Sequence, residues 1–324
     1  MADAGPGLVT VFGGSGFVGS QAVRALAKRG WRVRVAVRSP NSAYELRPLG
    51  DPGQIQLVRC DVTDVSEVSA ALKGADAAVN LVGILYETPK GTFEKMHVDA
   101  ARVIAEACVM QSVGRLVQVS AIGADVNSKG LYGWSKGQAE VVMRDIKPDT
   151  VVLRPSIVFG AGDGFLNRFA SMATLAPALP LVGGGGTKFQ PVYVGDVAEA
   201  IARAVVTDAA AGRTYELGGP AVWSFREILE YILRETGRDR MLAPLPFPIA
   251  RIVGSLAQMT ALVGIAPVLT KDQVAMLESD NVVGVGALTL NDLGIEATGL
   301  EAIAPSYLWR YRKGGQFAEG PGAA

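Results

Sequence analysis

A glycine-rich turn between a valine-rich run and a helical pattern constrains the fold of this chain more than any other feature. Residues 9–19 read V-T-V-F-G-G-S-G-F-V-G. Gly13 permits a tight turn with positive φ, and Gly16 leaves the backbone open to a pyrophosphate. Gly19 lets the following helix pack closely, and the N–H groups at the start of that helix attract phosphate. Because the turn follows a strand and opens a helix, it predicts a dinucleotide-binding unit.

Strand-like and helix-like runs alternate through the first half of the chain. The expected strands are 9–12, 32–37, 55–59, 77–81, 116–120 and 151–153, and the expected helices are 17–29, 65–72, 93–111 and 132–146. Valine-rich strands that alternate with helices of this length predict an α/β fold with a doubly wound parallel sheet, the Rossmann fold. Ligands of such a fold bind beyond the carboxyl ends of the strands.

The pattern loosens after about Pro155, which indicates a change of organisation. We expect residues 1–155 to form the dinucleotide-binding domain. Residues 156–324 are expected to form a smaller, mostly helical C-terminal lobe, interwoven with the Rossmann sheet and ending in a docking tail. Further helices are expected at 194–206 and 224–236.

One segment of the second half is unusually apolar. Across residues 247–269, Arg251 is the only charged residue. Such a segment suits a helical hairpin that covers the core of the lobe. That hairpin is the favoured interpretation, and the alternative is an exposed apolar surface that docks on a membrane face or a large partner.

Composition excludes several classes of protein. The 31 basic and 31 acidic residues balance, so no nucleic-acid partner is expected. Cys60 and Cys108 are too few for a disulfide framework or a zinc cage and are expected to be buried thiols. His97 is the single histidine, which excludes a histidine-rich metal site. We therefore expect no metal.

The residues after the second expected strand bear on the choice of nucleotide. An acidic residue here would bind the adenosine ribose hydroxyls and favour NAD. This chain has Arg38 and Ser39 instead, with Arg34 nearby. A guanidinium can bind a 2′-phosphate through two N–H groups. The sequence therefore favours NADPH (NADP), with NAD(H) the second choice.

Two more strand ends supply candidate nucleotide contacts. Asp61 follows the third expected strand, where its carboxylate either binds the adenine amino group or starts the next turn. Residues 80–83, N-L-V-G, end the fourth strand, where their backbone would line the ribose.

Tyr132 and Lys136 lie four residues apart and share one face of an expected helix. An ammonium beside a phenol favours phenolate, so we expect Lys136 to lower the pKa of Tyr132. The same ammonium can hold the nicotinamide ribose. Ser120, at the end of the preceding strand, could polarise a substrate carbonyl.

These motifs together resemble the short-chain dehydrogenase/reductase superfamily, in its extended or atypical branch. The resemblance rests on residues 13–19, Ser120, Y-G-W-S-K at 132–136, L-R-P-S-I-V-F-G at 153–160 and Q-P-V-Y-V-G-D-V-A at 190–198. Within the superfamily the chain is similar to the dehydrogenase-like accessory subunit of respiratory complex I and its bacterial relatives. That similarity rests on R-S-P-N-S-A (38–43), N-L-V-G-I-L-Y-E (80–87), F-L-N-R-F-A-S-M (165–172), L-T-K-D-Q-V (269–274), D-L-G-I (292–295) and P-S-Y-L-W-R-Y-R (305–312).

The resemblance implies a set of site residues. Its catalytic positions are Ser120, Tyr132 and Lys136. Its cofactor-binding positions are Gly13, Ser15, Gly16, Phe17, Val18, Gly19, Arg38, Ser39, Asp61, Val62, Leu81, Val82, Gly83, Tyr132, Lys136, Pro155 and Ile157.

The resemblance also implies a function and a location. It implies an accessory subunit of respiratory complex I that binds NADPH mainly as a structural element, near the quinone entrance and the membrane surface. Such a subunit is peripheral, on the cytoplasmic face of the inner membrane of a bacterium or on the matrix side of a mitochondrion. The alternative is an active NAD(P)-dependent reductase, dehydrogenase or epimerase-like enzyme with an apolar substrate of the quinone, sterol or isoprenoid type.

Two features bear on that choice. In M-H-V-D (96–99), His97 stands where many family enzymes have an asparagine that holds a water for proton relay. The substitution compromises the relay, unless His97 is an ordinary helix residue near the nucleotide. Residues 307–313, Y-L-W-R-Y-R-K, mix aromatic and basic side chains and form either a docking tail or a closing helix with a solvated end.

Overall fold

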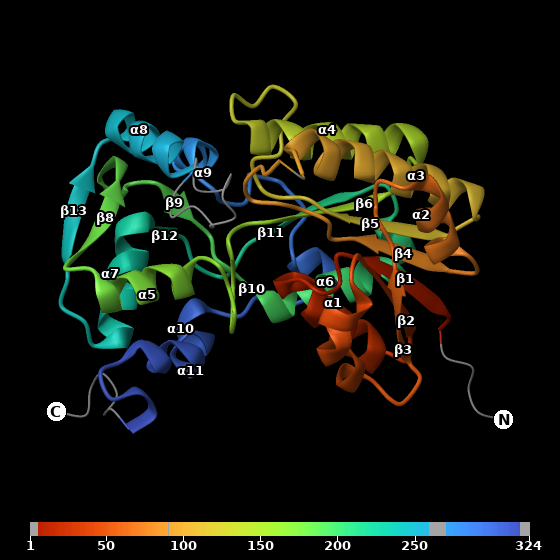
Figure 1. Cartoon of the computed structure of the whole chain (residues 1–324), viewed down its shortest axis with the longest axis horizontal. Coiled ribbons are helices and arrows are strands. Elements are labelled where there is room, and N and C mark those ends of the chain that lie inside the picture. Colours follow the sequence, from red (N-terminus) through yellow and green to blue (C-terminus); the bar gives the residue numbers. More distant parts are fainter. Residues whose placement is uncertain (1–5, 90, 259–269, 318–324) are drawn as a thin grey trace. The chain divides into compact units, whose positions relative to one another are not determined.

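The computed structural model describes residues 6–89, 91–258 and 270–317, which form two compact units (Figure 1). The first unit runs to Pro155 and takes in Gly195–Leu217 and Gly286–Ile295. The second unit comprises Ser156–Val194, Gly218–Val285 and the residues from Glu296 onward.

A seven-stranded parallel sheet is the centre of the first unit. Its strands are β1 (Leu8–Phe12), β2 (Arg32–Val37), β3 (Ile55–Arg59), β4 (Ala77–Asn80), β5 (Arg115–Val119), β6 (Val151–Pro155) and β11 (Thr214–Leu217). Their order is β11-β6-β5-β4-β1-β2-β3, and all neighbouring pairs are parallel. The order reverses between β1 and β4, which makes their carboxyl ends the switch point where such sheets bind ligands. The predicted doubly wound fold is confirmed.

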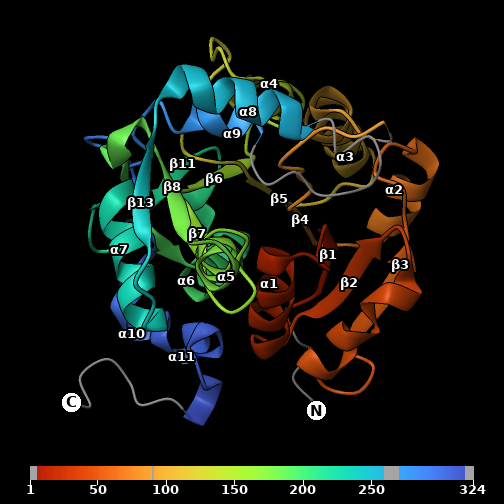
Figure 2. The ribbon, with the colours of Figure 1, turned by 60° about the vertical axis from the view of Figure 1, so that its left-hand side comes forward.

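Helices cover both faces of this sheet (Figure 2). The helices are α1 (Phe17–Lys28), α2 (Val65–Leu72), α3 (Ala100–Met110), α4 (Leu131–Ile146) and α6 (Val194–Val206). One face carries α2, α3 and α4, and the other carries α1 and α6. Because both faces are covered, Val9, Val11, Val33 and Val35 are completely buried. Burial on both sides explains why the strands are continuous apolar runs rather than alternating ones.

The helix expected at 93–111 is divided in the structure. Its first part, Glu94–Asp99, is π-helical, and α3 follows from Ala100. The wider turn directs both His97 and Val98 into the interior. A π-helical segment inside a helix is rare and is frequently found at a functional site.

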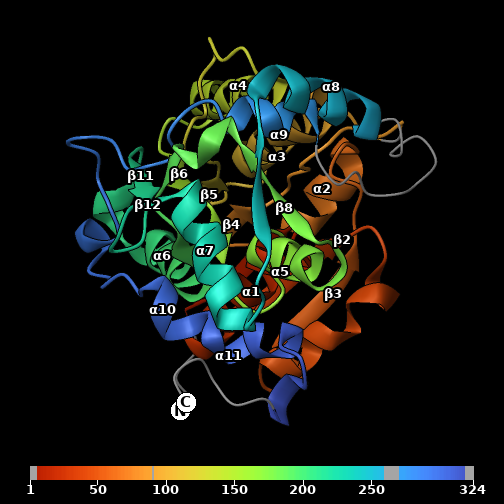
Figure 3. The ribbon, with the colours of Figure 1, turned by 90° about the vertical axis from the view of Figure 1, so that its left-hand side faces the viewer.

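Helices and short strands make up the second unit. The helices are α5 (Leu166–Leu175), α7 (Phe225–Thr236), α8 (Phe247–Gln258), α9 (Lys271–Met276), α10 (Leu300–Ile303) and α11 (Pro305–Leu308). The strands are β7 (Val158–Phe159), β8 (Ala178–Val182), β9 (Lys188–Phe189), β10 (Val192–Tyr193), β12 (Trp223–Ser224) and β13 (Met241–Leu245). Among the described residues they pair as β10-β7, β12-β9 and β13-β8, and the last pair is parallel (Figure 3). Sequence patterns did not reveal β8 and β13.

An aromatic cluster fills the core of the second unit beside α5 and α7. Phe165, Phe169, Phe189 and Phe225 contact one another with ring centroids 5.3–6.3 Å apart. Local signals place α7 against this cluster, because Ser224 and Glu227 form a reciprocal capping box at its start. Gly237 ends the helix in the left-handed conformation.

The apolar segment 247–269 is described in part. Residues 247–258 form α8. Residues 259–269, which were expected to form the rest of the hairpin, lie outside the described residues. On α8, Ile249, Ile252 and Val253 are 51%, 62% and 44% exposed. No helix among the described residues is long and apolar enough to cross a membrane.

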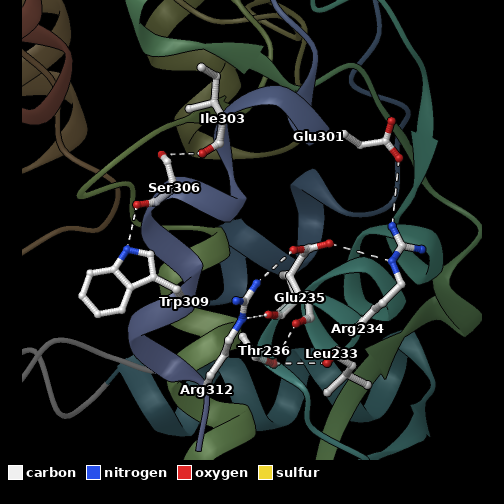
Figure 4. A network of polar contacts seen from close by, with 10 residues as sticks. Leu233, Arg234, Glu235, Thr236, Glu301, Ile303, Ser306, Trp309 and Arg312 are labelled. Atoms are coloured by element: carbon white, nitrogen blue, oxygen red, sulfur yellow. Dashed lines mark hydrogen bonds and ion pairs between the residues drawn. The ribbon is translucent and has the colours of Figure 1, made fainter. Parts of the chain in front are cut away.

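Residues 307–312 of the expected docking tail are bound within the second unit (Figure 4). Tyr307 is buried, and its hydroxyl donates to Asp163 Oδ2 at 2.8 Å. Arg312 Nε donates to the carbonyl of Glu235 at 2.7 Å, and the two side chains also form an ion pair. The aromatic and basic pattern therefore largely reflects closure of this unit, although Trp309 and Lys313 keep exposed side chains.

Candidate functional site

The glycine turn lies at the carboxyl end of β1, at the switch point of the sheet. Gly13 has φ +77°, and a Cβ there would stand 2.9 Å from the carbonyl carbon and oxygen of Leu81. A Cβ on Gly19 would overlap the carbonyl oxygen of Gly13. The fold itself therefore requires glycine at both positions, because the turn packs against α1 on one side and the end of β4 on the other.

Gly16 differs, because the fold does not require it. A Cβ there would meet one neighbour, Gly13 O, at 3.4 Å, and φ is an ordinary −78°. Gly16 is the N-cap of α1, and no described side chain caps this helix. Its first N–H groups therefore have no capping side chain among the described residues, and they are flanked by the exposed Ser15 and the half-buried Phe17 and Val18. This cradle suits a phosphate group.

Arg38 and Arg34 have different surroundings, although both come from β2. Arg38 is exposed just beyond the end of the strand, followed by Ser39. Arg34 instead donates to the carbonyls of Ala71 at 2.6 Å and Lys73 at 2.9 Å, which end α2. The guanidinium of Arg34 therefore caps the end of α2.

Asp61 starts the turn after β3, which is one of the two roles expected for it. Its Oδ1 accepts hydrogen bonds from Thr63 N–H at 3.0 Å and Thr63 Oγ at 2.8 Å. These bonds, with smaller contributions from Lys95 and Arg38, hold the pKa of Asp61 below its usual range. The next residue, Val62, is buried in the core.

Asn80 organises the loop after β4, a role that the sequence left open. Its Oδ1 accepts from Val82 N–H at 3.0 Å, and its Nδ2 donates to Gln118 Oε1 at 2.7 Å on the neighbouring strand. This arrangement fixes Leu81, Val82 and Gly83 beside the glycine turn. An asparagine at a strand end that caps its own backbone two residues on is the sequence signal that indicates such a role.

Ser120, Tyr132 and Lys136 all belong to the first unit, Ser120 just after β5 and the other two on α4. Ser120 is 4% exposed, and its Oγ has no hydrogen-bond partner among the described residues. Lys136 is buried, and its Nζ donates to Val119 O at 3.4 Å. A buried hydroxyl without a partner is unusual and suits a group that meets a ligand.

The pKa values of Tyr132 and Lys136 both depart from their ordinary values. Burial raises the pKa of Tyr132 to about 12, with no lowering by Lys136. Burial also lowers the pKa of Lys136 to about 8, and Glu140 partly opposes this shift. The expected lowering of the Tyr132 pKa by Lys136 is therefore wrong, because desolvation of the phenol is the only cause of the shift.

His97 is buried beside Tyr132, and both of its ring nitrogens form hydrogen bonds. Nε2 accepts from the Ile84 N–H at 3.0 Å, and Nδ1 is 2.8 Å from Ser135 Oγ. The ring also contacts Tyr132 edge-on, with centroids 5.7 Å apart. Burial and the nearby Lys136 lower the pKa of His97 to about 2, so the ring is neutral.

The remaining expected positions are less informative. Pro155 accepts from the Ile122 N–H at the end of β6, and Ile157 belongs to the second unit. Cys60 and Cys108 are buried free thiols, as expected, and burial raises the pKa of each to about 12. No cluster of potential metal ligands occurs among the described residues.

The geometry suits a dinucleotide, and comparison with known proteins decides the family. A family model described as the NAD dependent epimerase/dehydratase family matches residues 9–218, which is more than half of the chain. The chain belongs to this NAD-dependent family. The open cradle at Gly16 and the unpartnered Ser120 hydroxyl are where a nucleotide and a reacting group would fit.

Curated relatives and solved structures agree. The mitochondrial NADH dehydrogenase (ubiquinone) 1 alpha subcomplex subunit 9 of Arabidopsis thaliana is 37% identical over 322 residues, covering 95% of this chain and 79% of that protein. The mitochondrial NADH-ubiquinone oxidoreductase 40 kDa subunit of Neurospora crassa is 30% identical, covering 94% and 79%. The solved structure of DesIV, a dTDP-glucose 4,6-dehydratase from Streptomyces venezuelae with NAD and TYD bound, matches 94% of this chain and 96% of its own with TM-score 0.70 and 20% identity. The resemblance expected from the motifs is confirmed, and the solved structure supports the fold alone.

Proposed function

We propose that this protein is an NADP(H)-binding accessory subunit of respiratory complex I, in which the nucleotide is mainly a structural element. The observation that carries the proposal is the similarity, at 30–37% identity over about 95% of the chain, to proteins named as subunits of NADH-ubiquinone oxidoreductase. The match spans both units.

Arg38 supports NADPH as the nucleotide. It lies beyond the end of β2 with its side chain exposed, at the place where an acidic residue would select NAD. A guanidinium presents paired N–H donors that match phosphate geometry. The glycine turn and the N-terminus of α1 would hold the pyrophosphate, and the loop Leu81–Gly83 would line the ribose.

The protonation of the site supports a structural role for the nucleotide. With a pKa raised to about 12 by burial, the Tyr132 phenol stays protonated at neutral pH. This protonation disfavours abstraction of a proton from an alcohol, but it does not oppose donation of a proton to a carbonyl. His97, at the asparagine position of the family enzymes, engages both ring nitrogens within the protein. When bound, the nucleotide would supply hydride chemistry in principle, while these residues hold and orient it.

We assign nucleotide binding to the first unit and attachment to the second. The α8 side chains Ile249, Ile252 and Val253 form an exposed apolar row. Such a row suits peripheral attachment to complex I at the membrane surface. The location proposed is the cytoplasmic face of a bacterial inner membrane, or the matrix side of a mitochondrion.

One observation favours a second candidate, an active NAD(P)-dependent reductase with an apolar substrate. Ser120, Tyr132 and Lys136 are all retained, and the Ser120 hydroxyl has no partner among the described residues. In that case Ser120 would polarise the substrate carbonyl, and Tyr132 would exchange a proton with it.

Purification of complex I from membranes of the source organism tests the proposal. The protein is expected to remain with the complex and to carry one NADPH, detected after denaturation. A Tyr132→Phe variant is expected to leave NADPH retention and respiratory growth unchanged. Recovery of the protein free of the complex, or a growth defect of Tyr132→Phe with loss of a reductase activity, would favour the enzyme instead.

A further inference from the structure

The single histidine of the chain occupies the π-helical segment Glu94–Asp99 and is 2% exposed. Its two ring nitrogens reach different elements. Nε2 binds the Ile84 N–H in the loop after β4, and Nδ1 binds Ser135 Oγ in the first turns of α4. Few side chains can join two elements in this way, and the π-helical turn is what directs this one inward.

The hydrogen bonds define the tautomer of the ring. Nε2 must carry a lone pair, because its partner is a backbone N–H. The proton of the neutral ring is therefore on Nδ1, which donates to Ser135 Oγ, and Ser135 in turn donates to the carbonyl of Tyr132 at 2.9 Å. One directed chain of hydrogen bonds thus runs from Ile84 to the backbone of Tyr132.

This chain borders the nucleotide site. A Cβ on Gly83 would stand 3.3 Å from Lys136 Nζ and 3.7 Å from His97 Nε2. Phe93 and Tyr132 contact the imidazole as well, with ring centroids 5.4 Å and 5.7 Å from it. The imidazole and the ammonium therefore both lie on the side of Gly83 toward which a side chain would project.

We propose that His97 is a positioning residue, a neutral latch that ties the loop Leu81–Ile84 to the start of α4 and so sets the ribose side of the nucleotide site. The inference rests on the proposed function for its nucleotide. With both nitrogens engaged, the ring has neither a free lone pair nor a free proton. It therefore orders the site and does not conduct protons from Lys136.

Nuclear magnetic resonance of the wild type tests the tautomer without any nucleotide. Selective ¹⁵N labelling of histidine gives one residue to observe. We expect a protonated Nδ1, an unprotonated Nε2, and no change in either shift between about pH 8 and pH 5. A protonated Nε2, or a titration near the ordinary histidine pKa, would overturn the latch.

Two matched substitutions test its effect on the site. His97→Gln places an acceptor near the Nε2 position and keeps a partner for Ile84. His97→Asn keeps a partner for Ser135 and loses the Ile84 bond. By calorimetry we expect NADPH to bind His97→Gln within about threefold of the wild type and His97→Asn about tenfold more weakly, the scale of one lost hydrogen bond.

The outcomes separate the latch from a general packing role and from the proposed function. Thermal unfolding of the two variants without nucleotide measures the loss of packing. If His97 only packs, both variants should unfold at lower temperature than the wild type and should bind NADPH with equal affinity. That equality would overturn the proposal. If the wild type binds no NADPH, the proposed function fails, while the nuclear magnetic resonance measurement still decides whether the latch exists.

Discussion

Arg154 on β6 holds Glu140 on α4 in a two-pronged ion pair, one helical turn after Lys136. Arg154 Nε and Nη2 lie 2.9 Å and 2.6 Å from the two carboxylate oxygens, and Glu140 is 4% exposed. Glu140 is also the charge that opposes the lowering of the Lys136 pKa. The pair therefore joins the sheet to the helix of the site and supports its ammonium.

Removing this carboxylate should affect both stability and the site. We expect Glu140→Gln to lower the free energy of unfolding by about 2–3 kcal/mol, because it removes the closer of the two carboxylates that pair with Arg154. It should also lower the pKa of Lys136 further. Denaturant unfolding measures the first effect. Glu216→Gln is the control, since Glu216 is 3.6 Å from Arg154 and should cost less. Equal losses in the two variants would contradict this assignment.

Arg38→Asp tests nucleotide choice. Loss of a charged hydrogen bond to the 2′-phosphate should weaken NADPH binding by about 1.5–3 kcal/mol. NADH binding should not weaken and should become stronger, because an acidic residue here can bind the ribose hydroxyls. Calorimetry with both nucleotides measures the difference. Arg32→Asp makes the same charge change at the amino end of β2 and should leave NADPH affinity unchanged. Equal affinity of the wild type for NADPH and NADH would reject the assignment.

The buried His97 predicts a specific dependence of stability on pH. Its pKa is about 2 in the folded chain and 6.5 as the ordinary value, so below pH 6.5 the unfolded chain binds a proton that the folded chain does not. Stability should therefore be present above pH 6.5 and fall by about 1.4 kcal/mol for each pH unit below it. Urea unfolding at several values between pH 7 and pH 5.5 measures the slope. The slope should flatten in His97→Gln, and an unchanged slope there would assign it to other groups.

Residues 307–312 make contacts whose loss should destabilise the second unit. Tyr307 donates to the buried Asp163, and Arg310 and Tyr311 both donate to Asn167 Oδ1. We expect Tyr307→Phe to lower the free energy of unfolding by about 1–3 kcal/mol, because the carboxylate loses a partner. Lys313→Ala, at an exposed position, should change nothing. Thermal unfolding compares them, and equal midpoints for wild type and Tyr307→Phe would count against the closing role.

Sequence patterns predict the parts of this protein that depend on local signals. The valine-rich strands, the glycine turn and the place of Tyr132 and Lys136 on one helix follow from periodicity and spacing. The strand pair β8–β13 does not, because β13, M-L-A-P-L, contains a proline and lacks alternation. The patterns around Arg34 and in residues 307–313 leave the role of each cation open, since a cation has the same pattern whether it binds a ligand or caps a helix.

The candidate site shows the same limit. The role of His97 depends on a π-helical turn and on a partner 38 residues away in sequence, neither of which leaves a local signal. The pKa of Tyr132 is set by burial of the phenol, with no contribution from the neighbouring charge that the spacing indicates. Spacing identifies which side chains meet, whereas desolvation decides their protonation.

The apolar row on α8 predicts how the protein is attached. Ile252 and Val253 are exposed on this helix, and Arg251 beside them is engaged by Glu278 at 2.6 Å. We expect the double substitution Ile252→Asp and Val253→Asp to release the protein from membranes into the soluble fraction. Charges at these positions would have to be desolvated against lipid or an apolar partner, which costs several kcal/mol. Val141→Asp, at an exposed valine on α4, is the matched control and should stay with the membrane. NADPH binding by each variant shows that the first unit is folded, and thermal unfolding checks the second. If the folded double variant remains on the membrane with complex I, attachment is through another surface.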